Sequence, residues 1–166
     1  MRIIGVDPGT RRTGVGLIEA SGNRYQLIHF EVIKVKETLP IAERLHFIYH
    51  ALSQVIQEYK PDVLALENIF FGKDIQAMVK IGEARACAML AASEHGINVV
   101  EYPPARVKQS VSGNGRATKE QIQHMIKTLL NMKEAPPSDG ADALAVAICH
   151  LHTRGRNVPL SFRTVG

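Results

Sequence analysis

Residues 2–7 read Arg2-Ile3-Ile4-Gly5-Val6-Asp7, an apolar run that ends in a carboxylate. A short apolar run bounded by polar residues predicts a buried strand. Residues 62–67 repeat this arrangement, because Val63-Leu64-Ala65-Leu66 leads directly into Glu67. The chain is therefore expected to contain two buried strands that each end at an acid.

The segments around these two runs predict the rest of the fold. Residues 13–20 and 24–36 read as strands joined to the first by short links with Gly or Asn, which favours an antiparallel meander. The other expected elements are helices at 39–59, 74–95 (stopped by Gly96), 104–110, 118–130 (opened by a Thr118–Gln121 capping box) and 139–152, with strands at 62–67 and 97–101. This order predicts one α/β domain over residues 1–153, with a mixed five-stranded sheet flanked by helices. Residues 154–166 are expected to be a basic, flexible tail.

The composition is that of an ordinary globular protein. Hydrophobic residues make up 45% of the 166-residue chain and charged residues 22%, enough for one real core. No apolar run approaches the ~20 residues of a membrane helix, and no signal-peptide pattern is present, so no membrane association and a cytoplasmic location are expected. Cys87 and Cys149 lie among small apolar residues and are expected to be buried free thiols.

The formal net charge of +4 is unevenly distributed. Residues 104–133 carry a net charge of +5, and residues 151–166 add three arginines and no acid, whereas residues 1–103 sum to −1. A basic segment beside an acidic site indicates that a polyanion is held over that site. The alternative is a solvated helix face.

Four carboxylates are the candidate functional residues. Asp7 and Glu67 end their strands, and both would reach one crevice if those strands are adjacent and parallel. Asp139 and Asp142 are three apart in the first turn of the last expected helix, and therefore on one side of it. Two like charges at 4 Å repel by about 1 kcal/mol in water and about 4 kcal/mol at an effective dielectric of about 20. Divalent cations remove this cost, and two of them can support phosphodiester hydrolysis.

Each acid also has a simpler explanation when it is taken alone. Asp7-Pro8-Gly9-Thr10 is also the sequence of a tight turn, and Glu67 is also a common type of residue at the start of a loop. Asp139 and Asp142 also suit the positive end of a helix dipole. Glu101, which ends another expected strand, is a fifth candidate ligand.

A series of short motifs connects these residues. In chain order they are Arg2–Thr10 with Thr13-Gly14, Pro61-Asp62 running into Glu67 and Phe70, Gly82-Glu83-Ala84-Arg85, Val107-Lys108-Gln109, Gly113-Asn114-Gly115-Arg116-Ala117, Lys119-Glu120-Gln121, Asp139–Ala145 and Cys149-His150. Together they resemble the RuvC family of Holliday junction resolvases, the crossover junction endodeoxyribonucleases, from Met1 to about His152. Two departures are small, since Gly140 stands where alanine is usual and Ala86 where glycine is usual.

The resemblance implies a ribonuclease H-like fold, a homodimer and symmetric cutting of two strands of like polarity at a four-way DNA junction. It implies that Mg²⁺, or Mn²⁺ in its place, is the cofactor, with two ions per site, and that the products carry 5′-phosphate and 3′-hydroxyl ends. It also implies a role in recombination and repair beside a branch-migration motor of the RuvA and RuvB type. Residues that match the family's sites are Asp7, Glu67, Asp139 and Asp142 for catalysis and metal, and Phe70, Lys108, Arg116 and Lys119 for DNA.

The DNA-binding assignments have support from the residues themselves. Exposed Phe70 would stack on an unpaired base, worth about 1–3 kcal/mol per base, although core packing explains it equally well. Lys108 and Lys119 flank a glycine-containing loop whose N–H groups can approach phosphates, or they are simply solvated. The small residues between 82 and 92 would suit either a partner subunit or the core.

Two other functions remain open at this stage. Asp7-Pro8-Gly9-Thr10 and Gly14-Val15-Gly16 resemble the first phosphate loop of the actin and sugar-kinase ATPases, but that fold needs two such halves and more than twice this length. The other is a non-catalytic scaffold that binds junctions, against which the complete set of four acids argues.

Overall fold

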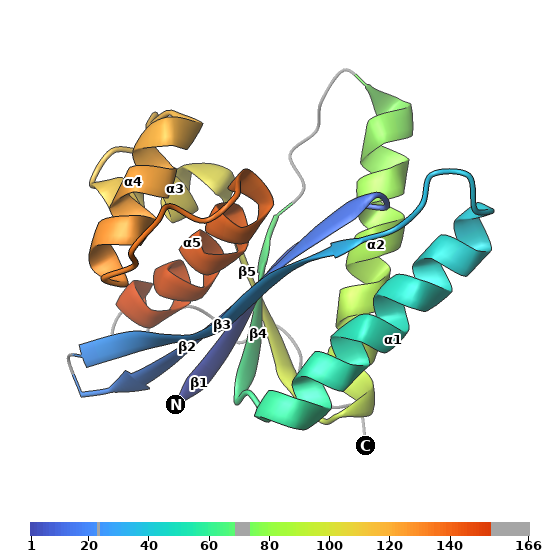
Figure 1. Cartoon of the computed structure of the whole chain (residues 1–166), viewed down its shortest axis with the longest axis horizontal. Helices are drawn as coiled ribbons and strands as arrows, with labels where there is room; N and C mark the ends of the chain where they lie inside the picture. The colour runs from blue at the N-terminus through green and yellow to red at the C-terminus, as the bar shows by residue number, and fades with distance from the viewer. Residues whose placement is uncertain (23, 69–73, 154–166) are drawn as a thin grey trace.

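The computed structural model describes residues 1–22, 24–68 and 74–153, and it contains a five-stranded sheet in the order β3-β2-β1-β4-β5 (Figure 1). The strands are β1 (Arg2–Asp7), β2 (Arg12–Ser21), β3 (Arg24–Lys34), β4 (Val63–Glu67) and β5 (Asn98–Tyr102). The helices are α1 (Ile41–Tyr59), α2 (Ile75–Glu94), α3 (Pro104–Ser112), α4 (Lys119–Leu129) and α5 (Ser138–Thr153). Strands β1, β2 and β3 are antiparallel, and β4 and β5 run parallel to β1, so the predicted mixed sheet and meander are confirmed.

The helix ends follow the local sequence signals. The capping box of α4 is present, with Thr118 accepting from the Gln121 N–H and the Gln121 side chain accepting from the Thr118 N–H. Gly96 follows α2 with φ +68°, the left-handed conformation that glycine adopts without strain. Helix α3 continues two residues past its predicted end, because Gly113 at φ +73° stops it only after Ser112.

Helices cover both faces of the sheet, with α1 and α2 on one face and α3, α4 and α5 on the other (Figure 1). Side chains alternate between the two faces along each strand. Val63 and Ala65 pack on the α5 side, whereas Leu64 and Leu66 pack on the α1 and α2 side. Glu67 therefore continues the set that faces α5.

Glycines in the sheet allow α5 to lie directly against it. A Cβ on Gly5 would lie 2.0 Å from the carbonyl oxygen of Ala143, and a Cβ on Gly14 would lie 1.9 Å from that of Asp139. The sequence predicted close packing from the small residues of the helix. The glycines of the sheet are equally important for this close packing, because only glycine fits beneath the α5 main chain at these positions.

Two further expectations concern burial and membranes. Cys87 and Cys149 are both free and buried, as predicted. No helix in the described ranges is long and apolar enough to cross a bilayer. Residues 69–73, which include Phe70, and the expected tail at 154–166 lie outside the described residues.

Candidate active site

Asp7 and Glu67 end two neighbouring parallel strands. The β1–β4 ladder runs from Ile3–Val63 to Val6–Leu66, and the two acids are the next residues of their strands. Asp7 follows Ile3 and Gly5 in the alternation of β1, so both acids lie on the face that α5 covers. The predicted crevice between these strand ends thus lies under α5.

The first turn of α5 lies over the end of β1. Asp7 pairs with Gly14 across the β1–β2 ladder, and the main chain of Asp139 rests on that glycine. Burial raises the pKa of Asp7 to about 7, with further increases from the negative charges of Asp142, Glu67 and Asp139 in that order. The structure therefore brings all four acids predicted from the sequence into one electrostatic cluster.

Two lysines of the basic segment face this cluster. Burial raises the pKa of Glu67 and that of Asp142, and the charges of Lys108 on α3 and Lys119 on α4 oppose both increases. The Nζ atom of Lys119 lies 3.7 Å from the Oδ2 atom of Asp142. Lys108 and Lys119 thus lie at the acid cluster rather than on a remote solvated face.

Sequence reasoning missed two arginines at the site. The Nε atom of Arg12 donates to Oδ2 of Asp139 at 2.6 Å. Arg44 on α1 donates through Nε and Nη2 to the carbonyl oxygen of Thr10, at 2.9 and 2.7 Å, and so holds the turn that follows Asp7. No local spacing signals these contacts, because their partners are 127 and 34 residues away along the chain.

The chemistry of the donors fits divalent cations. Within the described ranges, no three or more His, Cys, Asp or Glu side chains are gathered closely enough to hold a metal ion as they stand. Arg12 and Lys119 instead neutralise Asp139 and Asp142. Burial, followed by the charges of the three neighbouring acids, nevertheless raises the pKa of Asp7 to about 7, and hard cations with oxygen ligands relieve the cost of ionising such a site.

Two other candidates lie apart from the acids. Glu101 pairs with Leu66 in the β4–β5 register and forms an ion pair with Arg85 of α2, so it lies on the opposite face of the sheet and is not a fifth ligand. Arg116 is exposed on the turn between α3 and α4, where its main-chain N–H donates to Oδ1 of Asn114.

A mixed five-stranded sheet with acids at the ends of β1 and β4, joined by two more from a helix lying across it, defines the ribonuclease H-like class of nucleases. The family model described as crossover junction endodeoxyribonuclease RuvC matches residues 3–150. A curated relative of that description from Dehalococcoides mccartyi is 50% identical over 151 residues, which cover 90% of this chain and 92% of the relative. The chain belongs to the RuvC family.

Solved structures agree with this assignment. The structure of Thermus thermophilus RuvC in complex with Holliday junction substrate matches with a TM-score of 0.88 and 36% identity, over 93% of this chain and 94% of that one. The yeast mitochondrial Holliday junction resolvase Ydc2 matches with a TM-score of 0.66 over 92% of this chain and 80% of that chain. At 10% identity this match shows a likeness of fold alone. The match to the RuvC structure confirms the predicted ribonuclease H-like fold.

Proposed function

We propose that this chain is a structure-selective endonuclease that resolves four-way DNA junctions in recombination and repair. One observation carries the proposal: four half-buried acids from three separate elements interact electrostatically beside two lysines. Membership of a family described as crossover junction endodeoxyribonucleases supports the same activity and substrate. Residues 1–153 form the nuclease domain in this proposal, and the basic residues 154–166 add non-specific affinity for DNA.

The four acids are proposed to hold divalent cations, Mg²⁺ or Mn²⁺, two per site. When bound, these cations supply Lewis acidity and an activated water for attack on the phosphodiester. Asp7 must lose its proton to act as a ligand, and Arg12 and Lys119 must leave Asp139 and Asp142. Lys119, whose Nζ atom lies 3.7 Å from Asp142 while the two are paired, can then donate to a phosphate oxygen held at the same edge. No protein nucleophile takes part, and the products carry 5′-phosphate and 3′-hydroxyl ends.

The other DNA contacts belong to the same proposal. Lys108 of α3 and exposed Arg116 of the α3–α4 turn contact the DNA backbone. Phe70 stacks on a junction base. These contacts position the DNA, and the junction is selected by its shape rather than by base readout.

A homodimer suits a junction with two equivalent strands. One side of α2 supports it, because Ile75, Val79 and Leu90 are 74, 55 and 61% exposed and recur at helical spacing with Gly82 and Ala86 between them. We infer that this surface, the α2 stripe, packs against the same surface of a second copy. A motor of the RuvA and RuvB type would act with the dimer on the same junction.

Cleavage of a synthetic four-way junction tests the proposal. With Mg²⁺, the protein is expected to nick two opposing strands symmetrically and to leave a linear duplex of the same sequence intact. Asp7→Asn is expected to abolish cleavage while it still binds the junction, because a ligand is lost and no DNA contact is. Binding without cleavage at any Mg²⁺ concentration would instead identify a junction-binding scaffold, and full cleavage by Asp7→Asn would refute the metal role.

A further inference from the structure

Arg85 is a buried cation on the face of the sheet opposite to the acid cluster. It lies on the inner side of α2 and is only 8% exposed. Its Nη1 atom donates to the carbonyl oxygen of Glu67 at 2.7 Å, and its Nη2 atom forms an ion pair with Glu101 on β5. Because a buried charge without partners is strongly unfavourable, this guanidinium and its two partners form one fixed unit.

The unit lies where the sheet no longer holds Glu67 from both sides. The β1–β4 ladder ends at Val6–Leu66, so the main chain of Glu67 pairs only with Tyr102 of β5. Strand β4 ends at Glu67, and one further hydrogen bond follows it, from the Asn68 N–H to the Tyr102 carbonyl at 2.8 Å. Arg85 supplies the missing restraint on the Glu67 main chain from the α2 side of the sheet. Because its guanidinium is planar, it fixes the orientation of the Glu67 carbonyl as well as its distance from α2.

Resting on the function proposed above, we infer that Arg85 is a positioning residue for Glu67. It touches neither substrate nor cation. It clamps the last residue of β4 to β5 through Glu101, while the Glu67 side chain extends to the other face toward Asp7 and Asp142. If the main chain of a metal ligand shifts by about 1 Å, the rate of the chemical step falls by up to about 100-fold. We therefore expect Arg85 to affect the cleavage rate rather than the affinity for the junction.

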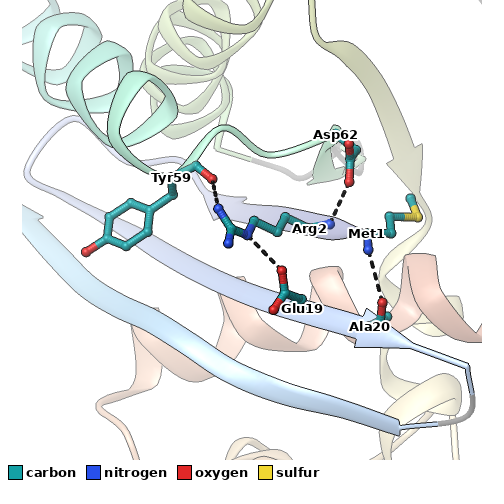
Figure 2. A network of polar contacts seen from close by, with 6 residues as sticks. All are labelled: Met1, Arg2, Glu19, Ala20, Tyr59 and Asp62. Atoms are coloured by element: carbon teal, nitrogen blue, oxygen red, sulfur yellow. Dashed lines mark hydrogen bonds and ion pairs between the residues drawn. The ribbon is translucent and has the colours of Figure 1, made fainter.

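Arg2 provides a matched control at the far end of the sheet (Figure 2). Its Nε donates to Oε1 of Glu19 at 2.9 Å and its Nη1 to the carbonyl oxygen of Tyr59 at 2.9 Å, so it also joins a carboxylate to a main-chain carbonyl. It lies at the start of β1, whereas Asp7 ends that strand. Arg2→Met thus removes the same chemistry without acting on Glu67.

The test compares Arg85→Met, Arg85→Lys and Arg2→Met in single-turnover cleavage of a four-way junction, in junction binding with Ca²⁺, and in calorimetric titration with Mn²⁺. For Arg85→Met we expect a cleavage rate lower by about 10- to 100-fold and Mn²⁺ affinity weaker by at least about 10-fold, with junction affinity within about 2-fold. Arg85→Lys, which can reach one partner but not both, is expected to recover part of each loss. Arg2→Met is expected to match the wild type in all three measurements well below its melting temperature.

Wild-type cleavage by Arg85→Met, or an equal loss in Arg2→Met, would overturn the inference. If Arg85→Met does not fold, Arg85→Lys and Glu101→Gln take its place, and wild-type rates in both would overturn it. If the wild-type protein fails to cut the junction, the proposed function fails, and the Mn²⁺ titration still decides on Arg85. Equal Mn²⁺ affinity in the wild type and the Arg85 variants would then overturn the inference.

Discussion

The carboxylate of Asp7 lies under the first turn of α5 with three other acids around it. Its pKa of about 7, raised mainly by burial, exceeds the value of 3.8 expected for an unburied aspartate. Between those two pH values the folded protein binds more protons at this position than the unfolded chain does. The free energy of unfolding therefore falls as the pH rises from about 4 to 7, and ligands that bind the folded state offset this loss.

Asp7→Asn is accordingly expected to stabilise the protein in EDTA. At pH 8 the free energy of unfolding should rise by about 1–3 kcal/mol, because the neutral amide avoids the cost of a carboxylate that is ionised while it is largely buried. At pH 4 the two proteins should differ little, since Asp7 is then protonated. Urea denaturation at both pH values measures this effect, with the exposed acid variant Glu134→Gln as the control. A less stable Asp7→Asn protein at pH 8 would contradict it.

The site residues that could be predicted from the sequence are those that stand at a recognisable position in a local pattern. Asp7 and Glu67 end apolar runs, and Asp139 and Asp142 share a helical turn, so local pattern was sufficient to select them. Arg12, Arg44 and Arg85 were not found, because each acts on a carboxylate or carbonyl that only the tertiary fold brings near. Glu101 was wrongly considered as a ligand, because the sequence shows that it ends a strand but not which face of the sheet its side chain occupies.

At the level of elements, α5 is placed by the glycines beneath it. A helix normally packs on a sheet through side chains, but here the main chain of Ala143 and Asp139 lies against Gly5 and Gly14. The order of helices and strands was predictable, because periodicity and caps are local. This close crossing was not, because it depends on glycines in β1 and β2 meeting a helix more than 120 residues later in the chain.

Gly14→Ala is expected to damage both stability and catalysis. Its Cβ would lie 1.9 Å from the Asp139 carbonyl oxygen, so the first turn of α5 must move away from β2. We expect the free energy of unfolding to fall by about 1–3 kcal/mol and the cleavage rate by at least about 10-fold.

Gly140→Ala is the control from the same turn. Its Cβ would lie 3.3 Å from the Phe30 ring and at ordinary contact distances of 3.7 and 3.8 Å from Pro137 and Pro136. No main-chain atom is among these neighbours, and alanine favours the helix, so its stability should stay within about 1 kcal/mol of the wild type. Denaturation and single-turnover cleavage measure both variants. Equal behaviour of Gly14→Ala and Gly140→Ala would show that the close contact does not place the acids.

At the scale of the whole molecule, DNA and a partner subunit would use different faces. The acids and their lysines lie on the face of the sheet that α3, α4 and α5 cover, because Lys108, Lys119 and Asp142 belong to those helices. Helix α2, which carries the α2 stripe, lies on the other side of the sheet (Figure 1). Two copies joined through the α2 stripe would therefore leave both acid clusters accessible. This arrangement is what simultaneous cutting of two equivalent strands needs.

If the proposed dimer forms through the α2 stripe, Leu90→Asp is expected to turn it into a monomer, because a charge buried in an apolar interface remains without a partner. Sedimentation velocity measures this change. Phe47→Asp is the control, since Phe47 is 50% exposed but lies on α1 beside His29 and Glu31 of β3. The monomer should nick single strands without cutting both strands in one encounter. A Leu90→Asp protein that stays dimeric would exclude the α2 stripe as the interface.

Lys119 connects the cation state of the site with its affinity for DNA. Its ammonium lies 3.7 Å from Asp142, and under the proposed function a divalent cation bound by Asp142 would release it toward phosphate. Each phosphate contact contributes about 0.9 to the slope of log binding constant against log salt concentration. Lys119→Ala should thus lower the slope by nearly that amount in Ca²⁺, which supports binding without cleavage, but by clearly less in EDTA.

The exposed lysine variant Lys133→Ala serves as the control for this difference. Lys133 lies after α4, and no ion pair joins it to an acid of the site in the described part of the chain, so any change in slope for Lys133→Ala should be the same in Ca²⁺ and EDTA. Fluorescence anisotropy of a labelled junction across a salt series gives both slopes. If Lys119→Ala lowers the slope equally in the two conditions, Lys119 binds phosphate independently of the cation and the exchange of partners at Asp142 does not occur. If it lowers the slope in neither, Lys119 is not a phosphate contact, and its charge serves only to balance the acids.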